Sequence, residues 1–324
     1  MSSAKSRLAG GKVLVTGGAG FLGSHLCDAL LGLGHEVICL DNFISGSRDN
    51  IKHLDGNPKF KLIEHDVSLP TTTPIEGLTG IFHFASPASP NPASSVSYMA
   101  HPIETLMANS IGAKNMLDLD SSNNCQIIFA STSEVYGDPE VHPQTEDYVG
   151  HVSPNGPRSC YDESKRFMEA LAFAYYRTHQ TKIKVIRIFN TYGPRMMLDE
   201  GRFIPTIVDS YLHKKTFLQY GDGSVTRSFC YVDDLLAGVL KVFEREVVGE
   251  VINLGNEEEY SVKETINVLE ELTGEKLVVE MSDALADDPQ RRQPDLTKAR
   301  RLLDWSPKVG LKEGLRKMLA SYEK

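Results

Sequence analysis

Tyr161 and Lys165 lie four residues apart at the start of a stretch, residues 161–176, whose apolar spacing predicts a helix. Positions four apart share one face of a helix, so the phenol and the ammonium are expected to lie side by side. A free tyrosine has a pKa of about 10, and a nearby ammonium favours the phenolate and lowers that pKa. Such a phenolate can take the hydroxyl proton of a carbinol while a hydride leaves its carbon atom.

Thr132 and Glu134 follow a short apolar run, residues 126–130, that predicts a buried parallel strand. The carboxyl end of such a strand faces the ligand cleft of a doubly wound sheet. We therefore expect the hydroxyl of Thr132 to hold the substrate oxygen that loses its proton to Tyr161. Side chains alternate along an extended chain, so Glu134 is expected on the same side as Thr132.

A glycine-rich string lies near the start of the chain. Gly17, Gly20 and Gly23 are placed between an apolar strand, residues 12–16, and a helical pattern, residues 21–33. Glycine allows a tight turn and a close approach of the backbone to a pyrophosphate, and the N-terminus of the helix that follows offers N–H groups to it. The string therefore predicts a dinucleotide site.

Asp41 directly follows the next apolar run, residues 36–40, and points to NAD as the dinucleotide. A carboxylate at this position accepts hydrogen bonds from ribose hydroxyls and repels the 2′-phosphate of NADP. Arg48 lies close by in the sequence and leaves NADP as the less favoured alternative. Further residues are expected at the same cofactor site: Phe21, Leu22, Asn42, Asp66, Val67, Ala85 and Ser86, together with Tyr161 and Lys165.

The first half of the chain alternates short apolar runs with helical patterns, which predicts an α/β fold with a Rossmann-type, doubly wound parallel sheet. The expected strands are residues 12–16, 36–40, 60–64, 80–85, 126–130 and 184–188, and the expected helices are residues 21–33, 102–119 and 161–176. After residue 190 the pattern loosens, and Ser261 and Glu264 form a capping box that starts a further helix. We expect an NAD-binding domain over residues 1–190 and a smaller α/β substrate lobe over residues 191–324, with segments that can interchange across this boundary.

Composition narrows the class of protein. The chain has 324 residues and a formal net charge of −9, whereas a nucleic-acid-binding protein normally presents a basic face. Five cysteines without a Cys-x-x-Cys pair favour a reducing compartment over a disulfide framework or a metal site. No apolar run approaches the roughly 20 residues that span a bilayer, and no signal-peptide pattern precedes the first strand. We expect a cytoplasmic enzyme with no metal, no membrane and no nucleic-acid partner.

The chain resembles the extended short-chain dehydrogenases that act on nucleotide sugars, and the UDP-glucuronate decarboxylases in particular. The resemblance runs from Lys12 to about Leu319. The glycine string and the Tyr–Lys pair define only the superfamily, whereas longer strings are more specific. These strings are Ser86-Pro-Ala-Ser-Pro90, Ser131-Thr-Ser-Glu-Val-Tyr-Gly-Asp138, Gly156-Pro-Arg-Ser-Cys-Tyr-Asp-Glu163, Phe189-Asn-Thr-Tyr-Gly-Pro-Arg195, Tyr231-Val-Asp-Asp-Leu235 and Asp287-Asp-Pro with Arg292.

The resemblance implies a cycle in which bound NAD oxidises C4 of UDP-glucuronate to a ketone. CO2 then leaves from the carboxylate that is β to this ketone, and hydride returns to C4 to give UDP-xylose. Tyr161 would be the base, Lys165 its electrostatic partner and Thr132 the hydroxyl holder, while Glu134 and Arg227 resemble residues needed for the decarboxylation stage. The residues implied to bind the UDP-sugar are Pro87, Glu134, Arg158, Asn190, Arg202, Tyr220, Arg227 and Arg292. Arginine suits a diphosphate because its fork donates two parallel hydrogen bonds.

Some positions depart from the family pattern: Ser164 stands where glycine is usual before the catalytic lysine, Glu200 replaces an aspartate and Ala113 replaces a threonine. A UDP-glucuronate 4-epimerase would use the same threonine, tyrosine and lysine, and is the main alternative. A 4,6-dehydratase is less favoured because Ser133, rather than an aspartate, precedes Glu134. A catalytically inactive NAD-sensing protein would usually lack the tyrosine or the lysine.

The resemblance also implies a homodimer. The helices expected at residues 102–119 and 161–176 correspond to helices that pair across a two-fold axis in this superfamily, which would give a four-helix interface. The apolar surface for it would come from Ile103, Leu106, Ile111, Met168, Leu171 and Phe173.

Overall fold

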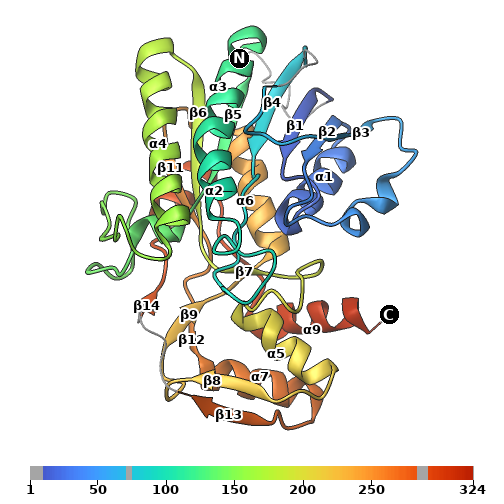
Figure 1. Ribbon diagram of the computed structural model, residues 1–324, viewed down its shortest axis with the longest axis vertical. Coiled ribbons are helices and arrows are strands. Elements are labelled where there is room, and N and C mark those ends of the chain that lie inside the picture. The colour runs from blue at the N-terminus through green and yellow to red at the C-terminus, as the bar shows by residue number, and fades with distance from the viewer. Residues whose placement is uncertain (1–9, 71–74, 283–290, 324) are drawn as a thin grey trace.

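The computed structural model describes residues 10–70, 75–282 and 291–323, so the Asp287-Asp-Pro string lies outside the described residues. Within these ranges the chain forms an upper part built on a large sheet and a smaller lower lobe (Figure 1). None of the described helices is both long enough and apolar enough to cross a membrane.

The large sheet has seven parallel strands in the order β11-β6-β5-β4-β1-β2-β3, which confirms the expected doubly wound fold. Its strands are β1 (Lys12–Thr16), β2 (Glu36–Asp41), β3 (Phe60–Glu64), β4 (Leu78–His83), β5 (Gln126–Thr132), β6 (Lys182–Ile188) and β11 (Val251–Leu254). The chain runs outward in one direction from β1 to β3 and then outward in the other direction from β4. In such sheets ligands bind at the carboxyl ends of the strands, beside this reversal.

Helices cover both faces of the sheet (Figure 1). The helices α1 (Phe21–Gly32) and α6 (Val232–Glu244) share a hydrophobic core with one face, and α3 (Ala113–Asn123) and α4 (Ser159–His179) share a core with the other. Strand β1 shows why both cores form: Val13 and Val15 pack in the first, and Leu14 packs in the second. Alternate side chains of a strand point to opposite faces, so an uninterrupted apolar strand is buried on both.

Some expected boundaries are wrong by a few residues. Strand β5 continues to Thr132 instead of ending at residue 130, so Thr132 is held by the sheet. Helix α4 begins at Ser159, which places Tyr161 inside its first turn rather than at its start. Strand β4 covers Leu78–His83 rather than residues 80–85.

The helix expected over residues 102–119 is interrupted. It consists of α2 (Pro102–Met107), a π-helical turn (Ala108–Gly112) and α3. The turn fits its surroundings closely, because a Cβ atom on Gly112 would lie 2.8 Å from Cγ2 of Val67. Single π-helical turns within helices are frequent at functional sites, and apolar periodicity does not reveal them.

The lower lobe and its junction with the first domain are built from shorter elements. They are β7 (Thr191–Tyr192), α5 (Phe203–Leu212), β8 (Phe217–Tyr220), β9 (Thr226–Ser228), β10 (Cys230–Tyr231), β12 (Glu259–Ser261), α7 (Val262–Thr273), β13 (Val279–Ser282), β14 (Arg291–Arg292), α8 (Thr297–Leu303) and α9 (Leu311–Tyr322). Of these, α8 packs against β11 and α6. Helix α7 begins directly after Ser261, and the expected capping box of Ser261 and Glu264 is present.

Residues 232–254 lie beyond the expected boundary at residue 190 but pack with the first domain, which is an interchange of the kind that the prediction allowed. Helix α6 packs against α1, and strand β11 joins the large sheet by pairing with β6, with Val251 opposite Val185. The chain therefore enters the lower lobe, returns to the first domain and leaves it again. Residues beyond position 190 therefore supply two elements to the first domain: strand β11, which pairs with β6 at the edge of the sheet, and helix α6, which packs on one face.

Candidate active site

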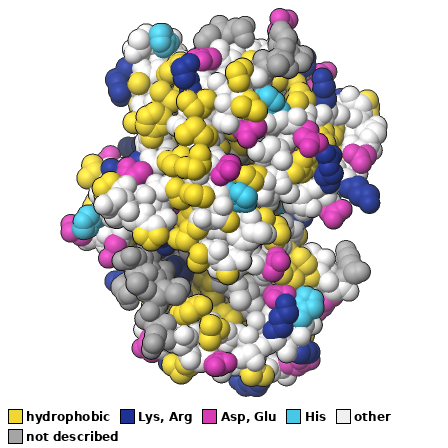
Figure 2. Space-filling model, in the orientation of Figure 1, with side chains coloured by type: hydrophobic (Ala, Val, Ile, Leu, Met, Phe, Trp, Pro, Cys, Tyr) yellow, Lys and Arg dark blue, Asp and Glu magenta, His cyan; other side chains and the backbone are white. Residues whose placement is uncertain are grey.

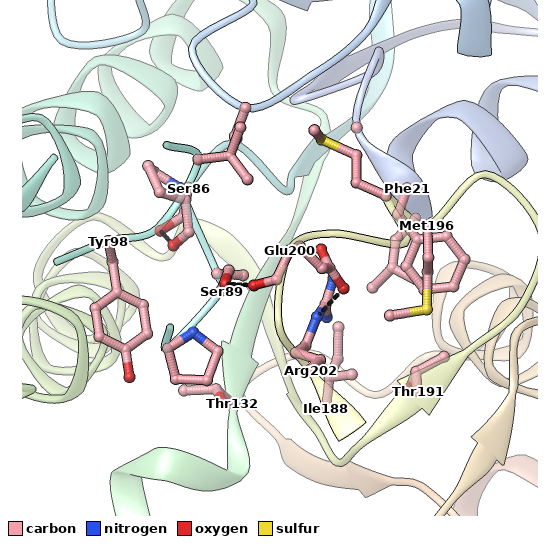
Figure 3. Close-up of a pocket in the computed structure, with 18 of the residues that line it drawn as sticks. Phe21, Ser86, Ser89, Tyr98, Thr132, Ile188, Thr191, Met196, Glu200 and Arg202 are labelled. Carbon is pink, nitrogen blue, oxygen red and sulfur yellow. Dashed lines mark hydrogen bonds and ion pairs between the residues drawn. The ribbon is translucent and has the colours of Figure 1, made fainter. Parts of the chain in front are cut away.

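A cavity of about 720 Å³ extends from the carboxyl ends of the sheet strands into the lower lobe. Every residue that the sequence and the resemblance point to lies on its wall, from the glycine string to Arg292. In Figure 3, Glu200 and Arg202 occupy the middle of the view, between Ser86 and Tyr98 on one side and Phe21 and Met196 on the other. The tertiary structure thus brings together one site from residues that are spread over most of the chain.

The glycine string has no room for side chains. A Cβ atom on Gly17, whose φ is +70°, would lie 2.8 Å from the backbone of Ala85, and one on Gly23 would lie 2.0 Å from the carbonyl oxygen of Gly17. No side chain caps α1, and its first turn holds no acidic residue. This close approach and the open helix N-terminus fit a dinucleotide pyrophosphate.

Asp41 ends β2 at the rim of the same turn. Its carboxylate accepts hydrogen bonds from the backbone N–H groups of Ala19 (2.9 Å) and Phe43 (2.8 Å). Burial raises the pKa of Asp41, and these two hydrogen bonds oppose the rise. Arg48 is turned to Glu64, with which it forms an ion pair, and its guanidinium lies 4.3 Å from the centroid of the Phe43 ring. Arg48, the residue that left NADP as an alternative, therefore already forms an ion pair with an acidic residue outside the glycine turn.

Hydrogen bonds also hold a second part of the expected cofactor site, around Asp66. Asn42 donates a hydrogen bond to Asp66 over 3.1 Å, and Ser68 donates two more to the same carboxylate. Burial alone would raise the pKa of Asp66, but these hydrogen bonds outweigh it and lower the pKa. Asn42, Asp66 and Val67 line the cavity, as the sequence predicts.

Tyr161 and Lys165 are buried side by side on α4. The Nζ atom of Lys165 lies 5.7 Å from the centroid of the Tyr161 ring and donates a hydrogen bond to the carbonyl oxygen of Ala130 over 2.7 Å. Burial lowers the pKa of Lys165 to about 7, although the charge of Glu169 opposes this. The two residues share a helix face, as their spacing predicts.

The expected phenolate is not the form that this site favours without a ligand. Burial raises the pKa of Tyr161 well above its ordinary value, while a hydrogen bond with Thr132 and the charge of Arg202 lower it. The spacing of Tyr161 and Lys165 predicts the effect of the lysine charge, whereas the loss of water around the phenol depends on the tertiary structure. A charged group bound in the cavity has to favour ionisation before Tyr161 can act as a base.

Glu134 lies at the centre of a group of arginines. It follows Thr132 in a short helical turn, Ser133–Tyr136, and its carboxylate forms ion pairs with Arg158 and Arg292. Burial would raise the pKa of Glu134, but the charges of Arg292, Arg158 and Arg227 lower it. These charges favour the ionised form of the carboxylate.

The arginines implied by the resemblance all line the cavity and have different partners there. Arg292, expected at the diphosphate, pairs directly with Glu134, whereas Arg227, expected at the decarboxylation step, donates to the carbonyl oxygen of Thr226 and acts on Glu134 through its charge. Arg202 forms two hydrogen bonds with Glu200, the position at which the family usually has an aspartate. Asn190, Tyr220 and Pro87 line the cavity as expected.

Three further residues contribute to the site and were not found from the sequence. Tyr98 stacks on Tyr161 with ring centroids 4.8 Å apart. Asn109, in the π-helical turn, donates hydrogen bonds to Ser86 and to Ser164, each over 3.0 Å, and so connects the cofactor wall to the helix of the catalytic pair. Asp162 lies next to Tyr161 in the string Tyr-Asp-Glu-Ser-Lys, but its spacing from Tyr161 and Lys165 predicts no function for it. The only sequence signal for these residues was their position within or near the recognised strings.

No metal centre accompanies these groups: among the residues that the structure describes, no three or more His, Cys, Asp or Glu side chains are placed to hold a metal ion. All five cysteines are buried free thiols. The cavity wall carries hydroxyl, phenol, ammonium, carboxylate and guanidinium groups.

This fold and this set of groups define a nucleotide-sugar enzyme of the extended short-chain dehydrogenase type. A family model described as GDP-mannose 4,6 dehydratase matches residues 14–318, and the chain belongs to that family. Within the family its relatives include the UDP-glucuronic acid decarboxylases. UDP-glucuronic acid decarboxylase 1 of Arabidopsis thaliana is 45% identical over 311 residues, which are 96% of this chain and 69% of the relative. UDP-glucuronic acid decarboxylase 6 of the same plant is 45% identical over 305 residues, which are 94% of this chain and 86% of the relative.

Solved structures of similar proteins include enzymes with other outcomes. UDP-glucuronic acid 4-epimerase from Bacillus cereus, in complex with UDP-glucuronic acid and NAD, superposes with a TM-score of 0.85 at 29% identity, covering 96% of this chain and 99% of the epimerase. The dTDP-glucose 4,6-dehydratase from Bacillus anthracis, in complex with NAD, has a TM-score of 0.81 at 27% identity, and 96% of each chain is covered. The fold is thus shared across the family, while the sequence is much closer to the decarboxylases.

Proposed function

We propose that the protein is an NAD-dependent UDP-glucuronate decarboxylase that forms UDP-xylose. Identity of about 45% to decarboxylases over nearly the whole chain, against 29% to the glucuronic acid epimerase, supports this choice. The observation that carries it is Glu134, an ionised carboxylate held by Arg158 and Arg292 at the strand end next to Tyr161. Such a charge cluster suits a substrate whose own carboxylate must be held and then lost.

The glycine turn and the N-terminus of α1 would hold the NAD pyrophosphate, and Asp41 would accept from the ribose hydroxyls. Bound NAD supplies an acceptor for the C4 hydride and a positive charge next to the phenol. Thr132 would hold the C4 oxygen, and Tyr161 would take the proton from it. Lys165 stabilises the resulting phenolate from the same helix face.

The ketone at C4 makes the next step possible. The bond between C5 and the C6 carboxylate breaks, CO2 leaves, and the electron pair remains as an enolate over C5, C4 and the C4 oxygen. Arg292 and Arg158 would hold the sugar carboxylate in the charged pocket, and Glu134 would repel it and favour its loss. A proton added at C5 and the return of the hydride to C4 complete UDP-xylose, with Tyr161 giving its proton back to the C4 oxygen.

We also propose that the enzyme is a cytoplasmic homodimer. Hydrophobic side chains gather over α2 and α4 on the face shown in Figure 2. Ile103, Met107, Ile111 and Phe167 are exposed there, with 63%, 39%, 43% and 51% of their surface accessible. Met168, expected in this interface, instead packs in the core behind α4. Paired α2 and α4 helices from two copies would cover this exposed surface.

Product analysis tests the proposed function directly. The purified protein is incubated with UDP-glucuronate, and the nucleotide sugars are identified by NMR and mass spectrometry. UDP-xylose with one CO2 per turnover is expected, without addition of cofactor if NAD stays bound. UDP-galacturonate without CO2 would overturn the proposal in favour of a 4-epimerase, the activity named for the solved neighbour.

A further inference from the structure

Asp162 adds a fourth charged group to the cluster around Glu134. It lies in the first turn of α4, one residue after Tyr161, and its side chain is 11% exposed. Its Oδ2 atom lies 4.0 Å from Nε of Arg158, the arginine that also pairs with Glu134. One guanidinium is therefore near two carboxylates, through Nε for Asp162 and through a terminal nitrogen for Glu134.

The surroundings of Asp162 are unusual for an aspartate that only stabilises a helix. An acidic residue in the first turn is favourable beside the helix dipole, and an exposed side chain suffices for that. The Oδ1 atom of Asp162 is instead buried and has no hydrogen-bond partner within the described residues. Buried carboxylate oxygens are nearly always hydrogen-bonded, and an exception needs an explanation.

We propose that Asp162 is a positioning residue, which competes with Glu134 for Arg158 and thereby sets how much positive charge the cluster offers to the carboxylate of a nucleotide sugar. This inference rests on the proposed function, in which the substrate carries that carboxylate. Asp162 itself need not touch the substrate, because it acts through Arg158, which lines the cavity.

The charges that face Asp162 come from several elements. Glu134 follows β5, Arg292 lies on β14, Arg158 is the N-cap residue of α4, and Glu163 follows Asp162 on α4, with the phenol of Tyr98 nearby. The two arginines and Glu134 together leave one positive charge. An ionised Asp162 cancels that charge, and a neutral Asp162 leaves it for the sugar carboxylate.

Asp162 changes its charge near neutral pH. Burial and the charge of Glu134 raise the pKa of Asp162 to about 7, while Arg158 and Arg292 act in the opposite direction. Below this pH the cluster therefore has one positive charge more than above it. Arg227 adds a further charge near Glu134, but an arginine does not titrate in this range. Affinity for a carboxylate-bearing sugar should therefore fall as the pH rises through about 7.

The test compares two ligands that differ at C6. Binding of UDP-glucuronate and of UDP-glucose, which has no carboxylate, is measured by calorimetry between pH 6 and pH 8.5 on the NAD-loaded Tyr161→Phe protein, in which chemistry is blocked. Affinity for UDP-glucuronate should fall between pH 6 and pH 8, by about tenfold for each unit by which the bound carboxylate raises the pKa of Asp162. Affinity for UDP-glucose should stay constant.

Two substitutions complete the test. Asp162→Asn in the same protein should keep UDP-glucuronate binding at pH 8 as tight as at pH 6. The matched control is Glu163→Gln, because Glu163 is the next residue, is half-exposed and pairs with Arg166; it should keep the pH dependence.

Two results would overturn the inference: the same pH dependence for both ligands, or an unchanged pH dependence in Asp162→Asn. If Asp162→Asn does not fold, the comparison of the two ligands decides alone. A wild-type protein that binds UDP-glucuronate but makes no UDP-xylose would refute the proposed function and leave the role of Asp162 to the binding data.

Discussion

Replacing Glu134 by glutamine should separate the two stages of the reaction. The amide keeps the size of the side chain and one acceptor oxygen, but removes the charge that pairs with Arg158 and Arg292. Tyr161, Lys165 and Thr132 are unchanged, so oxidation at C4 should continue. Release of CO2 should fall by about 10²-fold, a typical effect of one acid–base group.

The structure also gives an expected effect on stability. Loss of one partner from a buried ion pair destabilises a protein by about 3–5 kcal/mol, because charge is left uncompensated. Glu134 is 17% exposed at its side chain and the amide oxygen can still accept one hydrogen bond, so we expect the lower end, about 3 kcal/mol. The carboxylate of UDP-glucuronate can replace the missing charge, and its addition should recover most of the lost thermal stability. UDP-glucose should recover less.

The assay is a single-turnover experiment that records NADH absorbance and CO2 in parallel. Tyr161→Phe serves as the reference in which both signals disappear, because the first step needs the base. Glu163→Gln serves as the control for a neighbouring acidic residue and should match the wild type. Glu134→Gln should produce NADH without matching CO2. Equal loss of both signals in Glu134→Gln would refute a separate role for this carboxylate.

Three further predictions concern the cofactor, the oligomer and Lys165. Activity should depend on NAD, because the Asp41 carboxylate repels a 2′-phosphate; kinetics with each dinucleotide added to cofactor-depleted protein would contradict this if NADP were preferred. Light scattering should show a dimer, and Ile103→Glu with Phe167→Glu should give a monomer of 35.8 kDa, whereas an unchanged mass would exclude this interface. The pKa of Lys165 is lowered to about 7 in the folded cofactor-free protein but not in the unfolded chain, so the unfolded state binds more protons above pH 7 and stability should rise from pH 7 to pH 9. Denaturant titrations of Lys165→Met should lack this increment, and an identical slope in both proteins would contradict it.

Much of the fold follows from local sequence. The strands of a doubly wound sheet are short and apolar on both faces, so β1, β2 and β3 are recognisable without tertiary information. The glycine string is equally local, because it serves one turn between a strand and a helix. The helix period alone predicts that Tyr161 and Lys165 lie on one face of a helix, and in the structure they do.

Other features depend on contacts between distant segments. The break in the helix at residues 108–112 follows from the hydrogen bonds of Asn109 to residues 23 and 55 positions away, which no local period encodes. The return of residues 232–254 to the large sheet is decided by pairing of β11 with β6. Sequence patterns reach only a few residues along the chain, so they predict neither the break in the helix nor which segment returns to the large sheet.

The sequence by itself determined which groups are available for chemistry: the glycine turn, the acidic strand end, the hydroxyl and the Tyr–Lys pair. Only the tertiary structure decided their charge states and partners. It placed Arg292 next to Glu134, although 158 positions separate them in the chain, and it buried the phenol of Tyr161 so that its pKa rises. The physical reason is that residue spacing determines only which way side chains point within one helix or strand. Desolvation and ion pairing depend instead on which distant elements enclose each group.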